Sequence, residues 1–160
     1  DRRPPGPTLE LGNVLAHYGR TGHTVVDKYE EAPGVVNEDV IDWDTDQRFT
    51  TVISISTLEH VGWDEEPRAP EKVVFAVDRL RDLLAPRGEL LVTMPLGHNT
   101  YLDGLLAHGE LPFEHRSWLR GLPGNTWEET TAAVALATPY DTVARCAGAI
   151  FVGRLTRTGM

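Results

Sequence analysis

Short apolar runs separated by polar and glycine-containing turns recur along the chain, and their lengths predict β-strands. The clearest run is 49–56 (FTTVISIS), because it is rich in β-branched residues. Two apolar runs later in the chain, 89–94 (ELLVTM) and 148–155 (GAIFVGRL), also predict strands. Three shorter runs of the same kind lie in the first quarter of the chain: 8–12, 23–27 and 34–37.

Helical spacing of apolar residues is clearest in the segment 70–84, whose opposite face carries aspartate and arginine. Pro86 predicts the end of this helix. Shorter helices are predicted at 14–18 and 100–108. In the stretch that follows, up to residue 141, only 118–120 is predicted to form a strand.

The alternation of strands and helices predicts an α/β fold with a doubly wound, mostly parallel sheet flanked by helices on both faces. In such sheets ligands bind outside the carboxyl ends of the strands, so the residues after each strand are candidate site residues. The proline-rich residues 1–7 are predicted to be a flexible lead-in. Residues 8–160 are predicted to form a single domain.

The composition is that of one globular domain, with 160 residues, 41% of them apolar and 24% charged. No apolar run approaches the roughly 18 residues of a membrane-spanning helix, and the N-terminus lacks the apolar core of a signal peptide. The single cysteine, Cys146, excludes an internal disulfide and a multi-cysteine zinc site, and we expect it to be a small buried residue. These features predict a cytoplasmic protein.

The formal net charge of −9 disfavours non-specific binding to nucleic acid or to anionic membranes, and a small-molecule partner is expected instead. The oligomeric state is not readable from the sequence. Because the chain opens on Asp1 and a strand pattern begins within ten residues, we expect it to lack N-terminal helices.

The turn after the first predicted strand contains one glycine, Gly12, where a dinucleotide-binding turn needs three. NAD is therefore disfavoured. A nucleoside without phosphates needs only close backbone approach at this turn and an acid after the second strand, which Gly12 and Asp27 supply. After the third strand, Asp39 and the apolar Val40 and Ile41 suit the edge and face of an adenine ring.

The order and spacing of five segments resembles the class I S-adenosylmethionine (SAM)-dependent methyltransferases, from residue 8 to about residue 97. The segments are LELG, VVDKY, NEDVIDWD, FTTVISISTLEHVGWDEEP and LLAPRGELLVTMPLG. Within that family the chain is similar to the branch with Ser-x-x-Glu-His-Val after the fourth strand, here Ser56 to Val61. The chain departs from the family in the usual second glycine of the first motif, which is replaced.

The resemblance implies S-adenosyl-L-methionine as cofactor and a Rossmann-like methyltransferase fold. It implies ribose binding by Asp27, an adenine contact by Asp39, and contacts to the methionine part by the backbone around Gly12 and Ile55–Ser56. His60 is the candidate base, because an unperturbed imidazole titrates near neutral pH. The full set of expected cofactor-binding residues is Glu10, Gly12, Asn13, Asp27, Lys28, Asp39, Val40, Ile55 and Ser56.

Simpler interpretations stay open beside these. Glu38 and Asp39 equally suit the N-cap of a following helix. Glu59 and His60 could join His98 in a metal site, although no metal is expected. The remaining acids of this region are interpreted as a solvated face: Asp42, Asp44, Asp46, Glu65 and Glu66.

The expected function is methyl transfer from SAM to a hydroxyl or amine of a small molecule or sugar, as in bacterial glycan or natural-product pathways. The alternative is a non-catalytic SAM-fold module with a structural or interaction role, motivated by the altered first motif. A nicotinamide-dependent oxidoreductase is a weaker alternative, because the turn has only one glycine.

Overall fold

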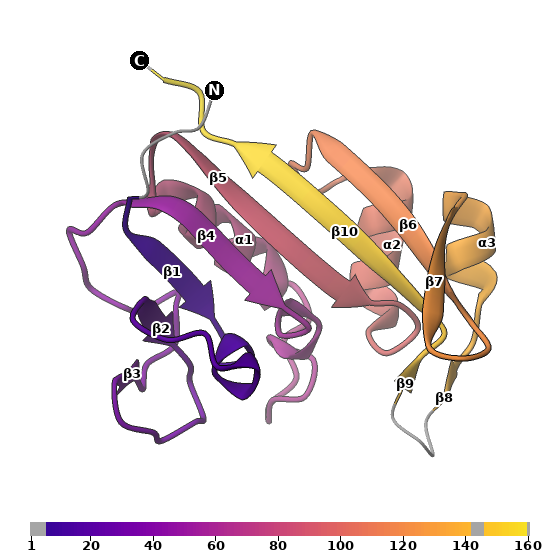
Figure 1. The fold of residues 1–160 in the computed structure, drawn as a ribbon, viewed down its shortest axis with the longest axis horizontal. Coiled ribbons are helices and arrows are strands. Elements are labelled where there is room, and N and C mark those ends of the chain that lie inside the picture. The colour runs from indigo at the N-terminus through magenta and orange to yellow at the C-terminus, as the bar shows by residue number, and fades with distance from the viewer. Residues whose placement is uncertain (1–5, 142–145, 160) are drawn as a thin grey trace.

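The computed structural model describes residues 6–141 and 146–159, and most of the predicted lead-in therefore lies outside the described residues. Eight strands form one sheet in the order β3-β2-β1-β4-β5-β10-β6-β7 (Figure 1). Six of them run in the same direction, while β10 and β7 run opposite to their neighbours. This mixed, mostly parallel sheet confirms the predicted α/β class.

The N-terminal half of the sheet is parallel and consists mainly of short strands. Its central pair is β1 and β4, in which Leu11 lies opposite Ser54. On its other side β1 pairs with β2, which pairs with β3 at the sheet edge. The bounds of these strands are β1 Thr8–Leu11, β2 Thr24–Val26, β3 Val35–Val36 and β4 Phe49–Ile55.

The C-terminal half of the sheet consists mostly of longer strands, three of whose pairings are antiparallel. Strand β10 lies between β5 and β6 and pairs with both, while β7 forms the outer edge. A separate two-stranded sheet joins β8 and β9. The bounds are β5 Leu84–Pro95, β6 His115–Leu122, β7 Thr126–Thr130, β8 Tyr140–Asp141, β9 Cys146–Ala147 and β10 Ala149–Thr156.

All three described α-helices lie on one face of the sheet, where their apolar sides share a single core. They are α1 (Lys72–Asp82), α2 (Thr100–His108) and α3 (Ala132–Ala137). Two 3-10 helices, η1 (Leu15–Tyr18) and η2 (Leu58–His60), follow β1 and β4. The expected cover on both faces is therefore not met in the described residues, because the segments after β1, β2 and β3 form turns and a 3-10 helix instead of α-helices.

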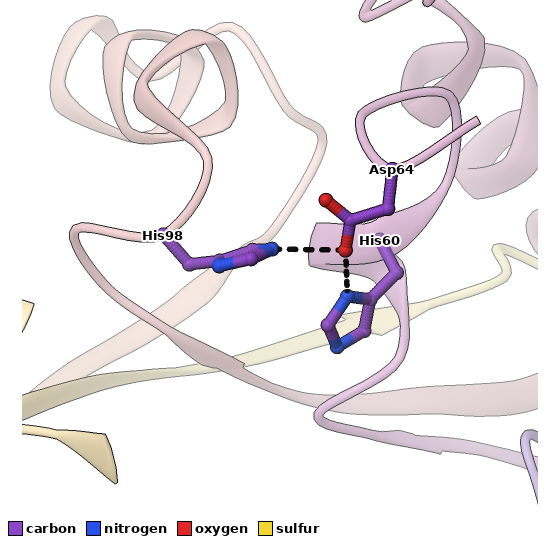
Figure 2. Close-up of side chains that lie close together, drawn as sticks. All are labelled: His60, Asp64 and His98. Carbon is purple, nitrogen blue, oxygen red and sulfur yellow. Dashed lines mark hydrogen bonds and ion pairs between the residues drawn. The ribbon is translucent and has the colours of Figure 1, made fainter. Parts of the chain in front are cut away.

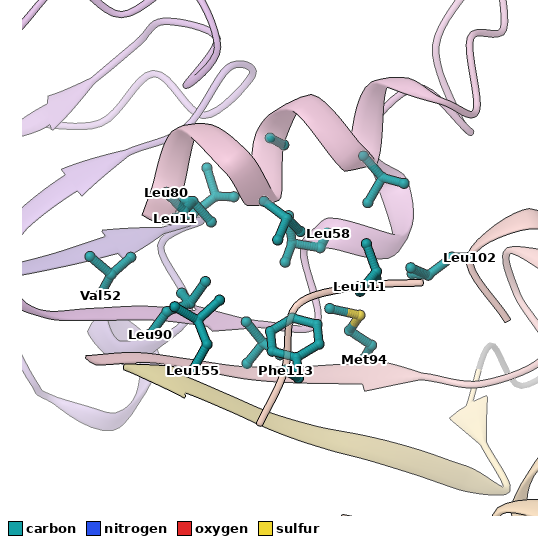
Figure 3. Close-up of a cluster of buried hydrophobic side chains, with 14 of the residues drawn as sticks. Leu11, Val52, Leu58, Leu80, Leu90, Met94, Leu102, Leu111, Phe113 and Leu155 are labelled. Carbon is teal, nitrogen blue, oxygen red and sulfur yellow. The ribbon is translucent and has the colours of Figure 1, made fainter. Parts of the chain in front are cut away.

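Side-chain alternation along β5 shows the difference between the two faces. Leu90 and Val92 are buried beneath the helices, whereas Leu91 points to the other face and is 36% exposed. On the helical face, leucines and other apolar residues from α1, α2 and the strands interdigitate around Met94 and Phe113 (Figure 3). This core fixes the strand ends that carry the candidate site.

Most predicted elements are present, and the deviations are local. Strand β5 begins at Leu84, directly after α1, instead of at residue 89. Strand β7 and helix α3 were not predicted. Cys146 is exposed in the short strand β9, so its expected burial is wrong. None of the helices within residues 6–141 and 146–159 has the length and apolar character needed to cross a bilayer.

Candidate functional site

Two adjoining cavities open at the carboxyl ends of β1, β2 and β4, and we call them together the cleft. They share the lining residues Asp27, Tyr29, Thr57 and His60. The larger cavity has a volume of about 480 Å³, within the range of small-molecule sites. The expected site residues that line the cleft are Gly12, Asn13, Asp27, Lys28, Asp39, Val40, Ser56 and His60.

The turn after β1 requires glycine at position 12. Gly12 has a φ of +85°, and a Cβ at this position would lie 2.3 Å from the hydroxyl oxygen of Thr57. Its N–H donates to the carbonyl of Val26 at 2.9 Å, which ties the turn to β2. The close approach of two backbone segments therefore brings the first turn to the wall of the cleft.

Ser56, at the end of β4, also has a positive φ, of 48°. A non-glycine residue in this region stores roughly 1 to 3 kcal/mol of strain, and such residues cluster at functional sites. The N–H of Ser56 donates to the carbonyl of Thr93 at 2.9 Å. This hydrogen bond holds Ser56 against β5, and Ser56 lines the cleft.

Two expected cofactor residues do not line the cleft formed by the described residues. Glu10 is fully buried: one carboxylate oxygen accepts from the N–H of Leu15 at 2.8 Å, and the other lies 2.7 Å from Nε2 of His23. Both oxygens of its carboxylate are therefore used to stabilise the segment after β1. Ile55 is also absent from the lining.

Asp27 follows β2 and uses only one of its two carboxylate oxygens to shape the local turn. Oδ1 accepts from the N–H groups of Tyr29 and Glu30, each at 2.8 Å. The side-chain amide of Asn37 donates to the carbonyl of Asp27 at 3.1 Å and steadies the same turn. Among the described residues Oδ2 has no hydrogen-bond partner, so it is free to accept from a ligand hydroxyl.

The only two lysines of the chain meet two carboxylates at the edge of the cleft. Nζ of Lys72 lies 2.6 Å from Asp39 and 2.7 Å from Glu65, and Nζ of Lys28 lies 3.2 Å and 3.0 Å from the same two carboxylates. We call these four residues the ion network. It joins the segments after β2, β3 and η2, which are far apart in sequence.

The carboxylates of the ion network stay ionised at neutral pH. Burial by itself raises the pKa of Asp39, but hydrogen bonds from Lys72, the Ile41 N–H and Lys28 outweigh burial and hold that pKa below its ordinary value. Glu65 behaves in the same way, with Lys72 and Lys28 as its main partners. The interpretation of Glu65 as part of a solvated face is therefore wrong, because its side chain is largely buried within this network.

The ion network changes how Asp39 can take part in binding. Its Oδ1 accepts from the N–H of Ile41 at 3.1 Å, which is the capping role left open by the sequence, although here within a turn. Its Oδ2 accepts from both lysines. An adenine amine can therefore reach this carboxylate only by sharing an oxygen with these donors.

His60 lies at the end of η2, where it lines both cavities of the cleft. Its Nδ1 is 2.5 Å from Oδ2 of Asp64, and Nε2 of His98 is 3.1 Å from the same oxygen (Figure 2). The two imidazole rings have centroids 4.9 Å apart. We call His60, Asp64 and His98 the imidazole cluster.

The imidazole cluster includes Asp64 and not Glu59, although the sequence allowed Glu59 as the partner of the two histidines in a metal site. The ligating atoms of the three residues lie within 4.8 Å of one another. The pKa of Asp64 is raised by partial burial but lowered more strongly by hydrogen bonds from His60 and His98, so the net change is downward. Asp64 is therefore an ionised acceptor between the two imidazoles.

Glu59 lies buried directly behind His60. Its side chain is 2% exposed, and Oε1 is 3.6 Å from Nε2 of His60. Within the described part of the chain Oε2 has no hydrogen-bond partner. Burial, with a smaller contribution from the negative charge of Asp64, raises the pKa of Glu59 to about 8. Its carbonyl accepts from the buried side-chain amide of Asn99, which also caps α2. Glu59 thus marks the junction between η2 and α2.

Sequence reasoning missed Asp64 and Lys72. The four-residue spacing of His60 and Asp64 was a usable signal, since such a spacing within one helical turn brings side chains together. No comparable signal was available for Lys72, because its partner Asp39 is 33 positions away in the sequence.

The fold is similar to solved structures of SAM-dependent methyltransferases. One is the N-methyltransferase NodS from Bradyrhizobium japonicum WM9 in complex with S-adenosyl-L-homocysteine (SAH), with a TM-score of 0.57, 13% identity, and coverage of 96% of this chain and 79% of that chain. A Thermotoga maritima SAM-dependent methyltransferase, named as a possible histamine N-methyltransferase, also gives a TM-score of 0.57, with 13% identity over 98% and 84% of the two chains.

A third similar structure is the Burkholderia thailandensis 1,6-didemethyltoxoflavin-N1-methyltransferase with 1,6-didemethyltoxoflavin and SAH, at a TM-score of 0.51 and 17% identity over 96% and 72% of the chains. No protein-family model matches the sequence, and no curated protein matches it either. At these identities the similarity shows the fold, which is the Rossmann-like fold of class I SAM-dependent methyltransferases.

Proposed function

We propose that this protein is a SAM-dependent methyltransferase of the branch with a Leu-Glu-His-Val segment after the fourth strand, and that it transfers a methyl group to a hydroxyl or amine of a small molecule or sugar. We place its activity in the cytoplasm. The observation that carries the proposal is the convergence of eight of the expected residues, from four strand ends, on one cleft.

The neighbouring structures support the choice of cofactor and acceptor. Two of the similar proteins were solved with SAH, and one of these also holds 1,6-didemethyltoxoflavin. Net charge supports the same choice, because a chain with a formal charge of −9 has little attraction for phosphate backbones.

The residues of the cleft fit a nucleoside with an amino-acid tail. Oδ2 of Asp27 would accept from the ribose hydroxyls, and Leu11, Val40 and Val61 provide apolar surface for the adenine ring. The glycine turn at position 12 and the strained Ser56 leave room for the methionine part. When bound, SAM supplies an electrophilic methyl group on a sulfonium sulfur.

The contribution of the chain itself is positioning and proton removal. Holding two reactants in line is worth up to about 7 to 11 kcal/mol in ideal cases. His60 would accept the proton that a hydroxyl or ammonium acceptor loses, which typically contributes roughly 100- to 10,000-fold to the rate. Because His60 lines both cavities of the cleft, its imidazole would lie beside the bound cofactor.

Calorimetric titration with SAM and SAH, with NADH as a control ligand, tests the proposal. We expect micromolar binding of SAM and SAH and none of NADH. In Asp27→Asn the Oδ1 acceptor for the turn is kept while Oδ2 is lost, so SAH affinity should fall roughly 10- to 100-fold. Asp44→Asn is the matched control, because Asp44 is exposed and lies outside the cleft lining.

Two results would contradict the proposal. A folded wild-type protein that binds neither SAM nor SAH would favour the non-catalytic module, and binding of NADH alone would favour the oxidoreductase. Unchanged SAH affinity in Asp27→Asn would refute only the ribose-binding role of Asp27.

A further inference from the structure

The imidazole cluster has a geometry that determines which nitrogen of His60 carries a proton. Asp64 is ionised, and an ionised carboxylate is only an acceptor. Because its Oδ2 lies 2.5 Å from Nδ1 of His60, that nitrogen must be the donor. In the neutral ring the remaining nitrogen, Nε2, then keeps its lone pair.

The same reasoning applies to the second histidine. Nε2 of His98 lies 3.1 Å from the same oxygen of Asp64 and must also donate to it. Figure 2 shows the two rings approaching this oxygen from different segments, His60 from η2 and His98 from the loop after β5. Two donors on one oxygen fix the orientation of the carboxylate more firmly than one donor would.

The local backbone also brings Asp64 close to His60. The N–H of Asp64 donates to the carbonyl of His60 at 3.1 Å, which closes a single turn and brings their side chains onto one side. The next residue, Glu65, accepts from the N–H of Gly62 at 3.2 Å and binds both lysines of the ion network. Asp64 is therefore tied to His60 by its own N–H and adjoins the anchored Glu65.

We propose that Asp64 is a positioning residue for His60: it holds the imidazole in the tautomer protonated at Nδ1 and presents the lone pair of Nε2 to the acceptor, while His98 orients Asp64. This inference rests on the proposed methyltransferase function. The acceptor's O–H or N–H bond breaks, its electron pair stays on the acceptor atom, and the proton goes to Nε2. The positive charge that results on His60 is balanced by the carboxylate of Asp64.

The groups facing His60 make this assignment specific. Glu59 faces Nε2 from behind at 3.6 Å, whereas Asp64 faces Nδ1. The pKa of Glu59 is raised to about 8 and that of Asp64 is lowered, so at pH 7 only the carboxylate at Nδ1 carries a full charge. Such a separation of two carboxyl groups by their environments distinguishes their roles.

The tautomer can be observed without knowing the acceptor. Long-range 1H–15N spectra of protein with 15N-labelled histidine, recorded at pH 7 and assigned with His60→Gln, distinguish a protonated from an unprotonated ring nitrogen. We expect His60 to be protonated at Nδ1 in the wild type. In Asp64→Ala the ratio of the two tautomers should shift about tenfold toward Nε2–H, the lower end for loss of a charge-assisted bond because both side chains are half exposed.

Further variants separate positioning from a purely structural role. Asp64→Asn keeps an oxygen acceptor and should retain the Nδ1–H tautomer. Asp44→Ala should leave the His60 signals unchanged. SAH affinity should stay within about twofold of the wild type in Asp64→Ala, since Asp64 is not part of the cleft lining.

Three outcomes would overturn the inference. They are an Nε2–H tautomer in the wild type, an unchanged tautomer in Asp64→Ala, and stoichiometric Zn²⁺ binding that is lost in both Asp64→Ala and His98→Ala. The last result would assign the imidazole cluster to a metal centre. Failure of SAH to bind the wild type would instead refute the methyltransferase proposal, so the two failures are distinguishable.

Discussion

The two halves of the sheet are stabilised by different interactions. Strands β1, β2 and β3 have only four, three and two residues, so their short ladders leave much of the local structure to polar side chains. Strands β5, β6 and β10 have twelve, eight and eight residues and pack around aromatic side chains. We call the part with β1 to β4 the polar half and the part with β5 to β10 the apolar half. The candidate cleft opens in the polar half, where individual polar contacts determine its shape.

The polar half shows a repeated device, in which a carboxylate after or within a strand accepts from backbone N–H groups of the following turn. Glu10 does so for Leu15, and Asp27 does so for Tyr29 and Glu30. Each contact is worth roughly 1.5 to 3 kcal/mol at most. We therefore expect substitutions in the polar half to affect binding more than folding, and the reverse in the apolar half.

The largest effect on folding is expected for Phe151→Ala in β10. Phe151 is fully buried and packs against the rings of Phe113 and Trp118. Its truncation leaves a cavity, and the free energy of unfolding should fall by about 3 to 5 kcal/mol in denaturant titrations. Phe75→Ala is the matched control, because Phe75 is 58% exposed and should change stability by less than about 1 kcal/mol. Equal effects of the two variants would contradict the assignment of the core.

A second large effect is expected at the junction of the two halves, where Glu59 lies buried. The unfolded chain releases the Glu59 proton near its ordinary pKa of 4.5, whereas the folded protein retains it up to a pKa of about 8. Stability is therefore full below pH 4.5, falls as the pH rises, and levels off above pH 8. At pH 7 the loss of unfolding free energy amounts to at most roughly 3 kcal/mol.

This loss should disappear in Glu59→Gln, which cannot ionise. We expect the difference in unfolding free energy between wild type and Glu59→Gln to change in favour of the variant between pH 4.5 and pH 8. Glu71→Gln serves as the control, since Glu71 is exposed at the start of α1. A pH-independent difference would show that Glu59 is ionised in the folded protein.

The contrast between the halves also explains what the sequence could predict. Strands β4 and β10 and helices α1 and α2 were predicted within a few residues, because their apolar positions repeat with a clear period. Strand β7 and helix α3 were not, because the segment TWEET has an exposed outer face and AAVALA is too short for a helical period. The one-sided cover of the sheet depends on which connections form α-helices, and periodicity in short polar segments does not show this.

Prediction of the site followed the same division. Residues directly after strands, such as Gly12, Asp27 and His60, were found because the carboxyl ends of parallel strands meet at one edge. The buried position of Glu10 and the lysine pairing of Asp39 were not found, because both depend on partners distant in sequence. The sequence therefore predicted which residues follow the strand ends. The pairing of charged side chains from distant segments could be seen only in the structure.

A moderate effect is expected at the first turn of the polar half. Gly12→Ala should lower stability by roughly 1 to 3 kcal/mol, because alanine is strained at a φ of +85° and its Cβ meets the Thr57 hydroxyl. SAH affinity should fall in the same variant. The double variant with Thr57→Ala removes the clash but not the strain, so a double-mutant cycle of unfolding free energies should show a favourable coupling. Strict additivity would mean that the close approach to Thr57 costs nothing.

The smallest expected effect concerns the ion network at the edge of the cleft. Lys72→Met should lower stability by about 1 kcal/mol at pH 7, since the network is only partly buried and exposed pairs contribute little. Arg81→Met, which breaks an exposed pair with Asp78 on α1, is the control and should cost less. SAH affinity should fall a few-fold in Lys72→Met only, because Asp39 and Glu65 line the cleft and lose a common partner.

The pH dependence of this pair of variants decides whether the network acts through its charges. Asp39 and Glu65 have pKa values lowered from 3.8 and 4.5, so their contribution is present above those values and is lost as the pH falls through the lower folded values. The stability difference between wild type and Lys72→Met should therefore shrink below about pH 4. If the difference stays constant down to pH 3, the aliphatic stem of Lys72 stabilises the segment by packing, and the polar half of the molecule depends less on charge than its contacts indicate.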